Sequence, residues 1–211
     1  TYTQKEKRKK SDQEKLQRIE RKKQGFKTQK EWQDFERDGN RIILTQDELE
    51  CVWIGANNDV QIIQEIKNTF YHSYQIKKAG SKTENINNIP SYQKLTYKNI
   101  YPFIDLVYEF HEKGGLKYSL VLYPGANLSD VQLNYSKDIS LQDNGSIYTP
   151  TVFGNIIDHQ PVTFYATHQN NTIESSYQVN NNTIGFKLGN YDKSKTIIID
   201  PWTQSPGFSS N

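Results

Sequence analysis

Between residues 41 and 199, short runs rich in Ile, Val, Tyr, Phe and Trp alternate with Gly, Asn, Asp and Pro. Runs of this composition suit strands, and the residues between them suit turns with positive or rigid φ angles. Many short strands at close spacing predict antiparallel sheets packed in a sandwich-like, mainly β fold. A loop is expected at 80–91. Strands are expected at 41–45, 50–54, 60–66, 70–76, 92–97, 104–111, 116–123, 131–135, 147–149, 162–165, 175–179, 183–188 and 196–199.

The first 39 residues follow a helical pattern instead. Ser11 is followed three positions later by Glu14, which is typical of a capping box, and Gly39 suits a helix end. We expect an α-helix over residues 11–38, with Gly25 tolerated or marking a kink. Its apolar residues form a stripe that is a candidate docking surface for a protein partner. The stripe consists of Leu16, Ile19, Phe26, Trp32 and Phe35.

Charge is distributed unevenly along the chain. The net charge of +2 divides into +5 for residues 1–39 and −3 for residues 40–211. A basic segment beside an acidic domain is compatible with an acidic partner, nucleic acid or lipid headgroups, or simply with a solvated helix. No nucleic-acid-binding motif accompanies the charge, so we expect no nucleic-acid partner.

Cysteine content and hydropathy exclude two further classes. Cys51 is the only cysteine, so no intrachain disulfide can form, and its apolar neighbours predict a small buried side chain. No run approaches the roughly 18 apolar residues of a membrane-spanning helix, so we expect no transmembrane segment. The chain begins at Thr1 and contains no Met, which indicates a processed or truncated start.

One strand carries residues that could ligate a metal. Alternation places Asp105, Val107, Glu109 and His111 on the same face of the strand at 104–111. Leu106, Tyr108 and Phe110 are then expected to face a core. Consecutive same-face positions are ~7 Å apart, so Asp105 and His111 cannot share one ion without a bend. An ordinary polar strand face is therefore favoured, and we expect no metal and no cofactor. A calcium ion in the Asp- and Asn-rich turns stays open.

Catalytic signatures are missing from the sequence. Asp158, His159 and His168 could supply a His–Asp dyad, but no nucleophile motif accompanies them. Zinc spacing, phosphate-binding loops and dinucleotide fingerprints are also absent. We therefore expect a protein that is not an enzyme. Tyrosine is abundant, and its rings can stack on sugars, so a carbohydrate-binding module is an alternative.

Four residues are expected to have structural roles at turns. Asp105 follows a Pro-containing turn, where its carboxylate can accept backbone N–H bonds. Gly125 follows Pro124 in another turn, and Asp200 precedes Pro201 where an extended segment ends.

Four segments share a recognisable order and spacing. The longest is YKNIYPFIDLVYEFHEKGGLKYSLVLYPGANLSDVQLNYS at 97–136. The others are WIGANND at 53–59, DNGSI at 143–147 and GNYDKSKTIIIDP at 189–201. Over about residues 50–202 the chain resembles an uncharacterised N-terminal domain of large bacterial cell-surface proteins that carry SBBP-type β-propeller or PKD-like repeats. The basic helical stretch before the first matched turn departs from that pattern.

The resemblance implies a location and a context, but no chemistry. The family is associated with gliding bacteria that use the type IX secretion system, so we expect an exported protein at the cell surface, associated with the outer membrane. Its partners would be envelope proteins and the downstream repeat domains of the same parent chain. The expected organisation is a basic helical segment (1–39), a β-rich domain (40–202) and the start of a linker or following repeat domain (203–211).

Overall fold

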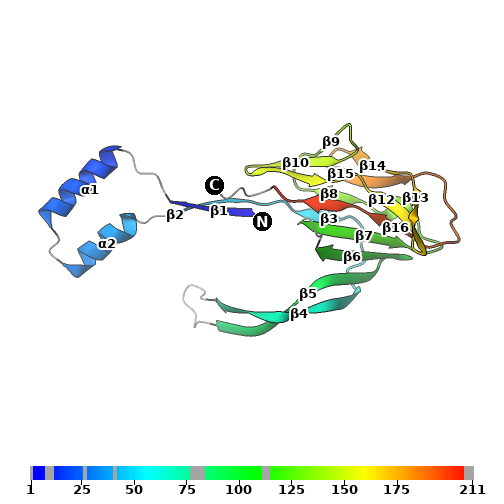
Figure 1. Ribbon diagram of the computed structural model, residues 1–211, viewed down its shortest axis with the longest axis horizontal. Helices are drawn as coiled ribbons and strands as arrows, with labels where there is room; N and C mark the ends of the chain where they lie inside the picture. Colours follow the sequence, from blue (N-terminus) through cyan, green and yellow to red (C-terminus); the bar gives the residue numbers. More distant parts are fainter. Residues whose placement is uncertain are drawn as a thin grey trace. The chain divides into compact units, whose positions relative to one another are not determined.

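The computed structural model describes residues 2–7, 12–25, 28–39, 42–76, 84–110 and 115–206. The fold is mainly β, with antiparallel sheets and an N-terminal helical region, which confirms the predicted fold class. The chain divides into two compact units, Thr1–Glu48 and Leu49–Asn211. Figure 1 shows the elements of both units.

The first unit combines two strands with two helices. Strand β1 (Tyr2–Lys7) pairs antiparallel with β2 (Ile42–Asp47), and α1 (Asp12–Gln24) and α2 (Gln29–Gly39) lie between them in the sequence. The predicted helical region is confirmed, but it consists of two helices instead of one. The β1 segment, YTQKEK, was not predicted because it lacks an apolar run.

Local hydrogen bonds explain why the helical region breaks. Gly25 has a φ of +75° and its N–H donates to the Lys22 carbonyl (3.3 Å), so it ends α1 in the left-handed conformation that glycine favours. The Thr28 hydroxyl then accepts the N–H of Glu31 (3.2 Å), which caps the start of α2. Ser11, the predicted cap of the first helix, lies outside the described residues.

The second unit contains two antiparallel sheets. Among the described residues, the larger sheet has eleven strands and the smaller has four, in the order β14-β15-β8-β3. The smaller sheet consists of β3 (Cys51–Trp53), β8 (Leu133–Tyr135), β14 (Ser175–Asn180) and β15 (Thr183–Leu188). The larger consists of β4 (Gln61–Ile76), β5 (Glu84–Tyr101), β6 (Ile104–Phe110), β7 (Leu116–Leu122), β9 (Ser140–Leu141), β10 (Ile147–Thr151), β11 (Gly154–Asp158), β12 (Val162–Tyr165), β13 (His168–Ile173), β16 (Ile197–Asp200) and β17 (Trp202–Gln204).

Strand β7 organises the larger sheet. It pairs with β6 along one edge and with β16 and β17 in succession along the other. The two successive strands are separated by the buried Pro201, and their outer neighbours differ: β16 pairs with β12, whereas β17 pairs with β11. A proline at this break is tolerated because it has no N–H to contribute to the ladder.

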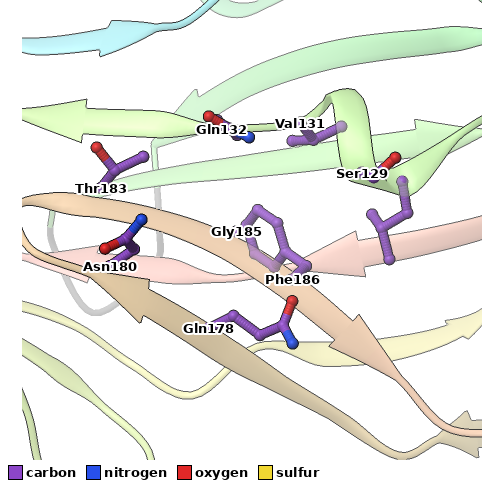
Figure 2. Close-up of a pocket in the computed structure, with 9 residues that line it drawn as sticks. Ser129, Val131, Gln132, Gln178, Asn180, Thr183, Gly185 and Phe186 are labelled. Atoms are coloured by element: carbon purple, nitrogen blue, oxygen red, sulfur yellow. The ribbon is translucent and has the colours of Figure 1, made fainter.

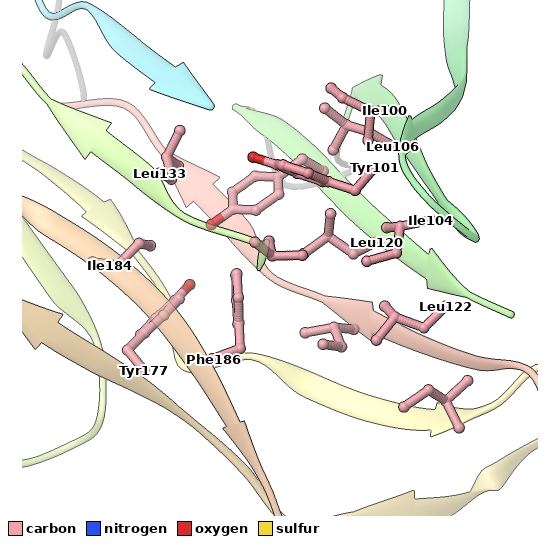
Figure 3. Close-up of a cluster of buried hydrophobic side chains, with 14 of the residues drawn as sticks. Ile100, Tyr101, Ile104, Leu106, Leu120, Leu122, Leu133, Tyr177, Ile184 and Phe186 are labelled. Atoms are coloured by element: carbon pink, nitrogen blue, oxygen red, sulfur yellow. The ribbon is translucent and has the colours of Figure 1, made fainter. Parts of the chain in front are cut away.

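The hydrophobic core lies between the inward faces of the two sheets (Figure 3). Alternation along β7 turns Tyr118, Leu120 and Leu122 inward, and the smaller sheet contributes Ile184 and Phe186. Burial of side chains of this size stabilises a fold by roughly 1.5–3 kcal/mol each. The two sheets therefore depend on each other for stability.

Strands β4 and β5 form a long hairpin that was predicted only in part. The predicted strands at 60–66 and 70–76 are one continuous strand, β4. The loop prediction for 80–91 is wrong over residues 84–91, which belong to β5. Strand β5 pairs with β4 from Glu84 to Lys98. Over Lys94–Tyr101 it also pairs, on its other side, with β6.

Two side-chain predictions are also wrong. Cys51 is exposed, because β3 is the last strand in the order of the smaller sheet. Phe110, expected in the core, is exposed at the end of β6. Val107 and Glu109 are half-buried, but Asp105 is buried like its neighbours Ile104 and Leu106, so the expected polar face does not extend to it.

Two glycines in the second unit allow a matched test of the contact between β7 and β17. Gly115 and Gly55 both have positive φ, but only at Gly115 would an added Cβ overlap the backbone carbonyl of Thr203. Gly55→Ala should lower the free energy of unfolding by about 1 kcal/mol, and Gly115→Ala by about 3 kcal/mol or more. Urea denaturation of the chain measures both. Equal losses would show that Gly115 is not in close contact with β17.

Candidate functional site

The turn between β5 and β6 is organised around Asp105. Its buried carboxylate accepts the N–H of Asn99 (2.8 Å) and the hydroxyl of Tyr123 (2.8 Å), and it forms an ion pair with Lys98. Burial alone would raise the pKa of Asp105, but the hydrogen bonds from Lys98, Asn99 and Tyr123 outweigh it and hold the pKa below its ordinary value. Asp105 therefore fastens the turn internally.

Gly125 lies in the turn that follows β7. Its φ is +95°, and an added Cβ would lie 3.6 Å from the ring of Phe103. The Tyr123 N–H donates to the Phe103 carbonyl (2.9 Å), which joins this turn to the β5–β6 turn.

Asp200 closes a second polar cluster on the outer face of the larger sheet. It accepts the hydroxyl of Ser119 (2.5 Å), and Lys117 lies 3.1 Å away from it. Lys117 also pairs with Glu109 (2.8 Å), one of the three residues considered as metal ligands. His111, the third predicted ligand, lies outside the described residues. Within the described ranges, no group of three or more His, Cys, Asp or Glu could hold a metal ion.

Asp158 is a buried carboxylate whose role the sequence did not indicate. It is 3% exposed, accepts the hydroxyl of Tyr135 from the smaller sheet (2.7 Å) and also accepts the hydroxyl of Thr203. Burial raises its pKa, although the bonds from Thr203 and Tyr135 oppose that shift. The sequence did hold one signal that Asp158 is buried. It lies two residues after Ile156, so alternation along the strand turns both side chains inward.

The His–Asp dyad that was considered from the sequence and not favoured is not formed among the described residues. The ring of His159 stacks on Trp202, with centroids 4.3 Å apart, and its Nε2 lies 3.1 Å from the Gln204 Oε1. The Nδ1 of His168 lies 2.9 Å from the hydroxyl of Thr167.

The helical stripe is divided between α1 and α2. Leu16, Ile19 and Trp32 are exposed. Phe35 is half-buried because the Arg18 guanidinium lies 3.7 Å from its ring centroid and donates to its carbonyl (2.8 Å). Phe26 lies outside the described residues.

The β4–β5 hairpin, which we call the arm, exposes many large apolar side chains. Its aromatic members neighbour one another: the ring of His72 lies 5.5 Å from Phe70 and stacks at 6.3 Å on Tyr74. The exposed set is Ile62, Ile63, Ile66, Phe70, Tyr71, Tyr74, Ile76 and Ile86. Only Ile86 of this set lies in the expected loop at 80–91. The other residues lie on the strands expected at 60–66 and 70–76, and the sequence did not indicate that these strands leave their apolar side chains exposed.

A hollow of about 260 Å³ on the smaller sheet, which we call the carboxamide groove, is the second candidate surface. Figure 2 shows Gln178 and Asn180 reaching it from β14, and Ser129 and Gln132 from the segment that precedes β8. None of the described residues that line it is charged. They are Leu128, Ser129, Val131, Gln132, Gln178, Asn180, Thr183, Gly185 and Phe186.

Asp105→Asn should lower the free energy of unfolding, because the ionised carboxylate of Asp105 stabilises the fold. Because its pKa is lower in the folded state, its contribution is present above the ordinary value near 3.8 and is lost as the pH falls through the folded-state value. Denaturation at about pH 7 should show a loss of about 1–3 kcal/mol that shrinks toward about pH 3.

Asp158→Asn should show the opposite pH trend. Its folded-state pKa is raised, so the wild-type contribution is complete below 3.8 and declines as the pH rises through the folded-state value. The stability of the variant relative to the wild type should therefore increase from about pH 3 to about pH 7. Parallel trends for the two variants would contradict the assigned environments.

No curated protein and no solved structure matches the chain significantly. Among the described residues, no helix has the length and apolar character that a membrane span requires. A protein family described as a domain of unknown function matches residues 1–202, so the helical region lies within the matched range. The chain therefore belongs to the domain of unknown function family DUF7948.

Proposed function

We propose that this chain is a non-enzymatic interaction module of a large exported bacterial cell-surface protein. Its partner is a protein of the cell envelope, in an assembly for adhesion, gliding motility or type IX secretion. The observation that carries the proposal is the apolar surface of the arm. Contiguous apolar patches on soluble domains mark interaction sites, and aromatic residues are enriched in protein interfaces.

The arm suits docking because it is both apolar and braced. Asn68 in β4 donates to the hydroxyl of Ser91 in β5 (2.9 Å), and Glu65 pairs with Lys94 (3.2 Å) and accepts the hydroxyl of Thr96 (3.0 Å). These cross-strand contacts hold the hairpin together while its aromatic rings face solvent. A preformed surface of this kind loses little conformational entropy on binding.

The helical stripe is a second surface for the same role. Leu16, Ile19 and Trp32 are exposed, so a partner, or a downstream repeat domain of the parent chain, could cover them. Phe35 is already partly covered by Arg18 and is less suited to a partner.

Internal pairing of the acidic side chains supports a non-catalytic role. Asp105, Asp158 and Asp200 each accept hydrogen bonds from other residues of the domain. An accessory domain of a secreted enzyme is a weaker alternative because it has no comparable observation behind it. A carbohydrate-binding module is the second candidate, and the carboxamide groove favours it.

Paired substitutions test the arm. Tyr71→Ser with Tyr74→Ser removes side chains that are 65% and 54% exposed. Leu141→Ser with Val162→Ser, at 50% and 53% exposed, is the matched control elsewhere on the unit. Mass spectrometry of material purified from solubilised native envelopes should show a stoichiometric partner that falls at least about tenfold with the arm variant and stays with the control.

A third variant, Leu16→Ser with Trp32→Ser, separates the helical stripe from the arm. Loss of the partner with this variant alone would move the docking surface to the helices. A wild-type chain that purifies without a stoichiometric partner would contradict the interaction proposal as a whole.

A further inference from the structure

The carboxamide groove exists because β15 has a glycine at its centre. Pairing with β14 sets Gly185 opposite Gln178 and Thr183 opposite Asn180. The intervening Ile184 is fully buried, so alternation turns these four residues away from the core. With no side chain at Gly185, the outer face of the sheet is hollow there.

The polar groups around this hollow are available for a ligand. Among the described residues, the side-chain amides of Gln132, Gln178 and Asn180 have no hydrogen-bond partner within the chain. The neighbouring Asn134 differs, because its amide donates to the hydroxyl of Thr183 (2.9 Å). Each free amide offers two N–H donors and a carbonyl acceptor.

We propose that the carboxamide groove binds a neutral oligosaccharide. Adjacent sugar hydroxyls donate and accept at once, as a side-chain amide does, and the half-buried Leu128 supplies apolar contact for the C–H edges of a ring. A charged ligand would find no counter-charge in the lining of the carboxamide groove itself. An apolar ligand would cover the amides without replacing their bonds to water.

The size of the groove indicates how much of the ligand is held. At about 260 Å³ it is just below the roughly 300–1,000 Å³ that is usual for small-molecule sites, which suits one sugar ring. A second hollow of about 590 Å³ adjoins it at Asn180 and Thr183 and extends the site along the β14–β15 turn. Its lining is Asn134, Asp138, Ile139, Asn180, Asn181, Asn182 and Thr183. The ligand is therefore a chain of sugars rather than a single ring.

This site is separate from the proposed protein-docking surface. The groove belongs to the smaller sheet and the arm to the larger one. Tyr71→Ser with Tyr74→Ser should therefore leave sugar binding unchanged. The loss of one activity without the other then shows which of the two proposals fails.

NMR titration of the full 211-residue chain tests the proposal. The probes are neutral hexasaccharides of glucose, mannose, galactose and N-acetylglucosamine, with a galacturonate hexasaccharide and an uncharged hexapeptide for comparison. At least one neutral sugar should shift the side-chain amide signals of Gln132, Gln178 and Asn180, with a Kd on the order of 1 mM. No shift with any neutral sugar, or shifts with the galacturonate or peptide alone, would overturn the assignment.

Gly185→Val fills the groove and supplies the decisive variant. An added Cβ would meet only the Val131 carbonyl, at 3.7 Å, and valine favours strands, so the fold should be kept. Sugar binding should be lost, whereas Ser176→Val, on the neighbouring strand β14 and outside the groove, should bind as the wild type does. Unchanged binding by Gly185→Val overturns the proposal.

Gln178→Ala gives an independent result in case the valine variant unfolds. It removes one amide without filling the hollow, and it should weaken binding by about 3- to 10-fold. Wild-type affinity for Gln178→Ala would equally overturn the proposal.

Discussion

Burial between the two sheets of the second unit is the interaction on which the structure depends. Leu106 and Leu120 of the larger sheet and Ile184 of the smaller one are almost completely removed from water. At the margin of this core, the Tyr135 hydroxyl donates to Asp158 and the Tyr177 hydroxyl donates to the carbonyl of His159 (2.9 Å). These bonds satisfy polar groups that could not otherwise be buried without cost. They also fix one sheet relative to the other.

The candidate surfaces follow from what this core leaves over. A strand turns every second side chain outward, so a two-sheet domain always has outer faces that need not serve stability. Here the outer face of the smaller sheet carries Gln178 and Asn180 around a glycine. The arm continues beyond Lys94–Tyr101, the part of β5 that pairs with β6. The exposed apolar residues of the arm have no core to enter. Stability and the proposed binding roles therefore rest on different residues.

Much of the fold could be predicted from the sequence, since strands such as 116–123 and 183–188 combine apolar alternation with clear turns. The prediction failed where backbone pairing alone makes a strand. The segment ENINNIPS at 84–91 is polar and contains a proline, yet it pairs with β4 because an exposed hairpin needs no buried face. YTQKEK in β1 is also polar, and its pairing with β2 makes it a strand.

The candidate sites were harder to predict because they depend on long-range register. Asp158 meets Tyr135 and Thr203, which are 23 and 45 residues away in the sequence. The carboxamide groove requires Gln132 to lie near Gly185, which only the pairing of β8 with β15 establishes. Single residues such as Asp105 could be given turn roles because their partners are close in the sequence.

Hydrogen exchange along the arm, compared between the isolated chain and the chain purified in its native envelope assembly, would test the interaction role. The account predicts that backbone amides of Gln61–Ile76, most of whose side chains are exposed, exchange more slowly in the assembly, while the buried strands of the core change little. Identical exchange of the arm in both samples would contradict the proposal that it is the docking surface.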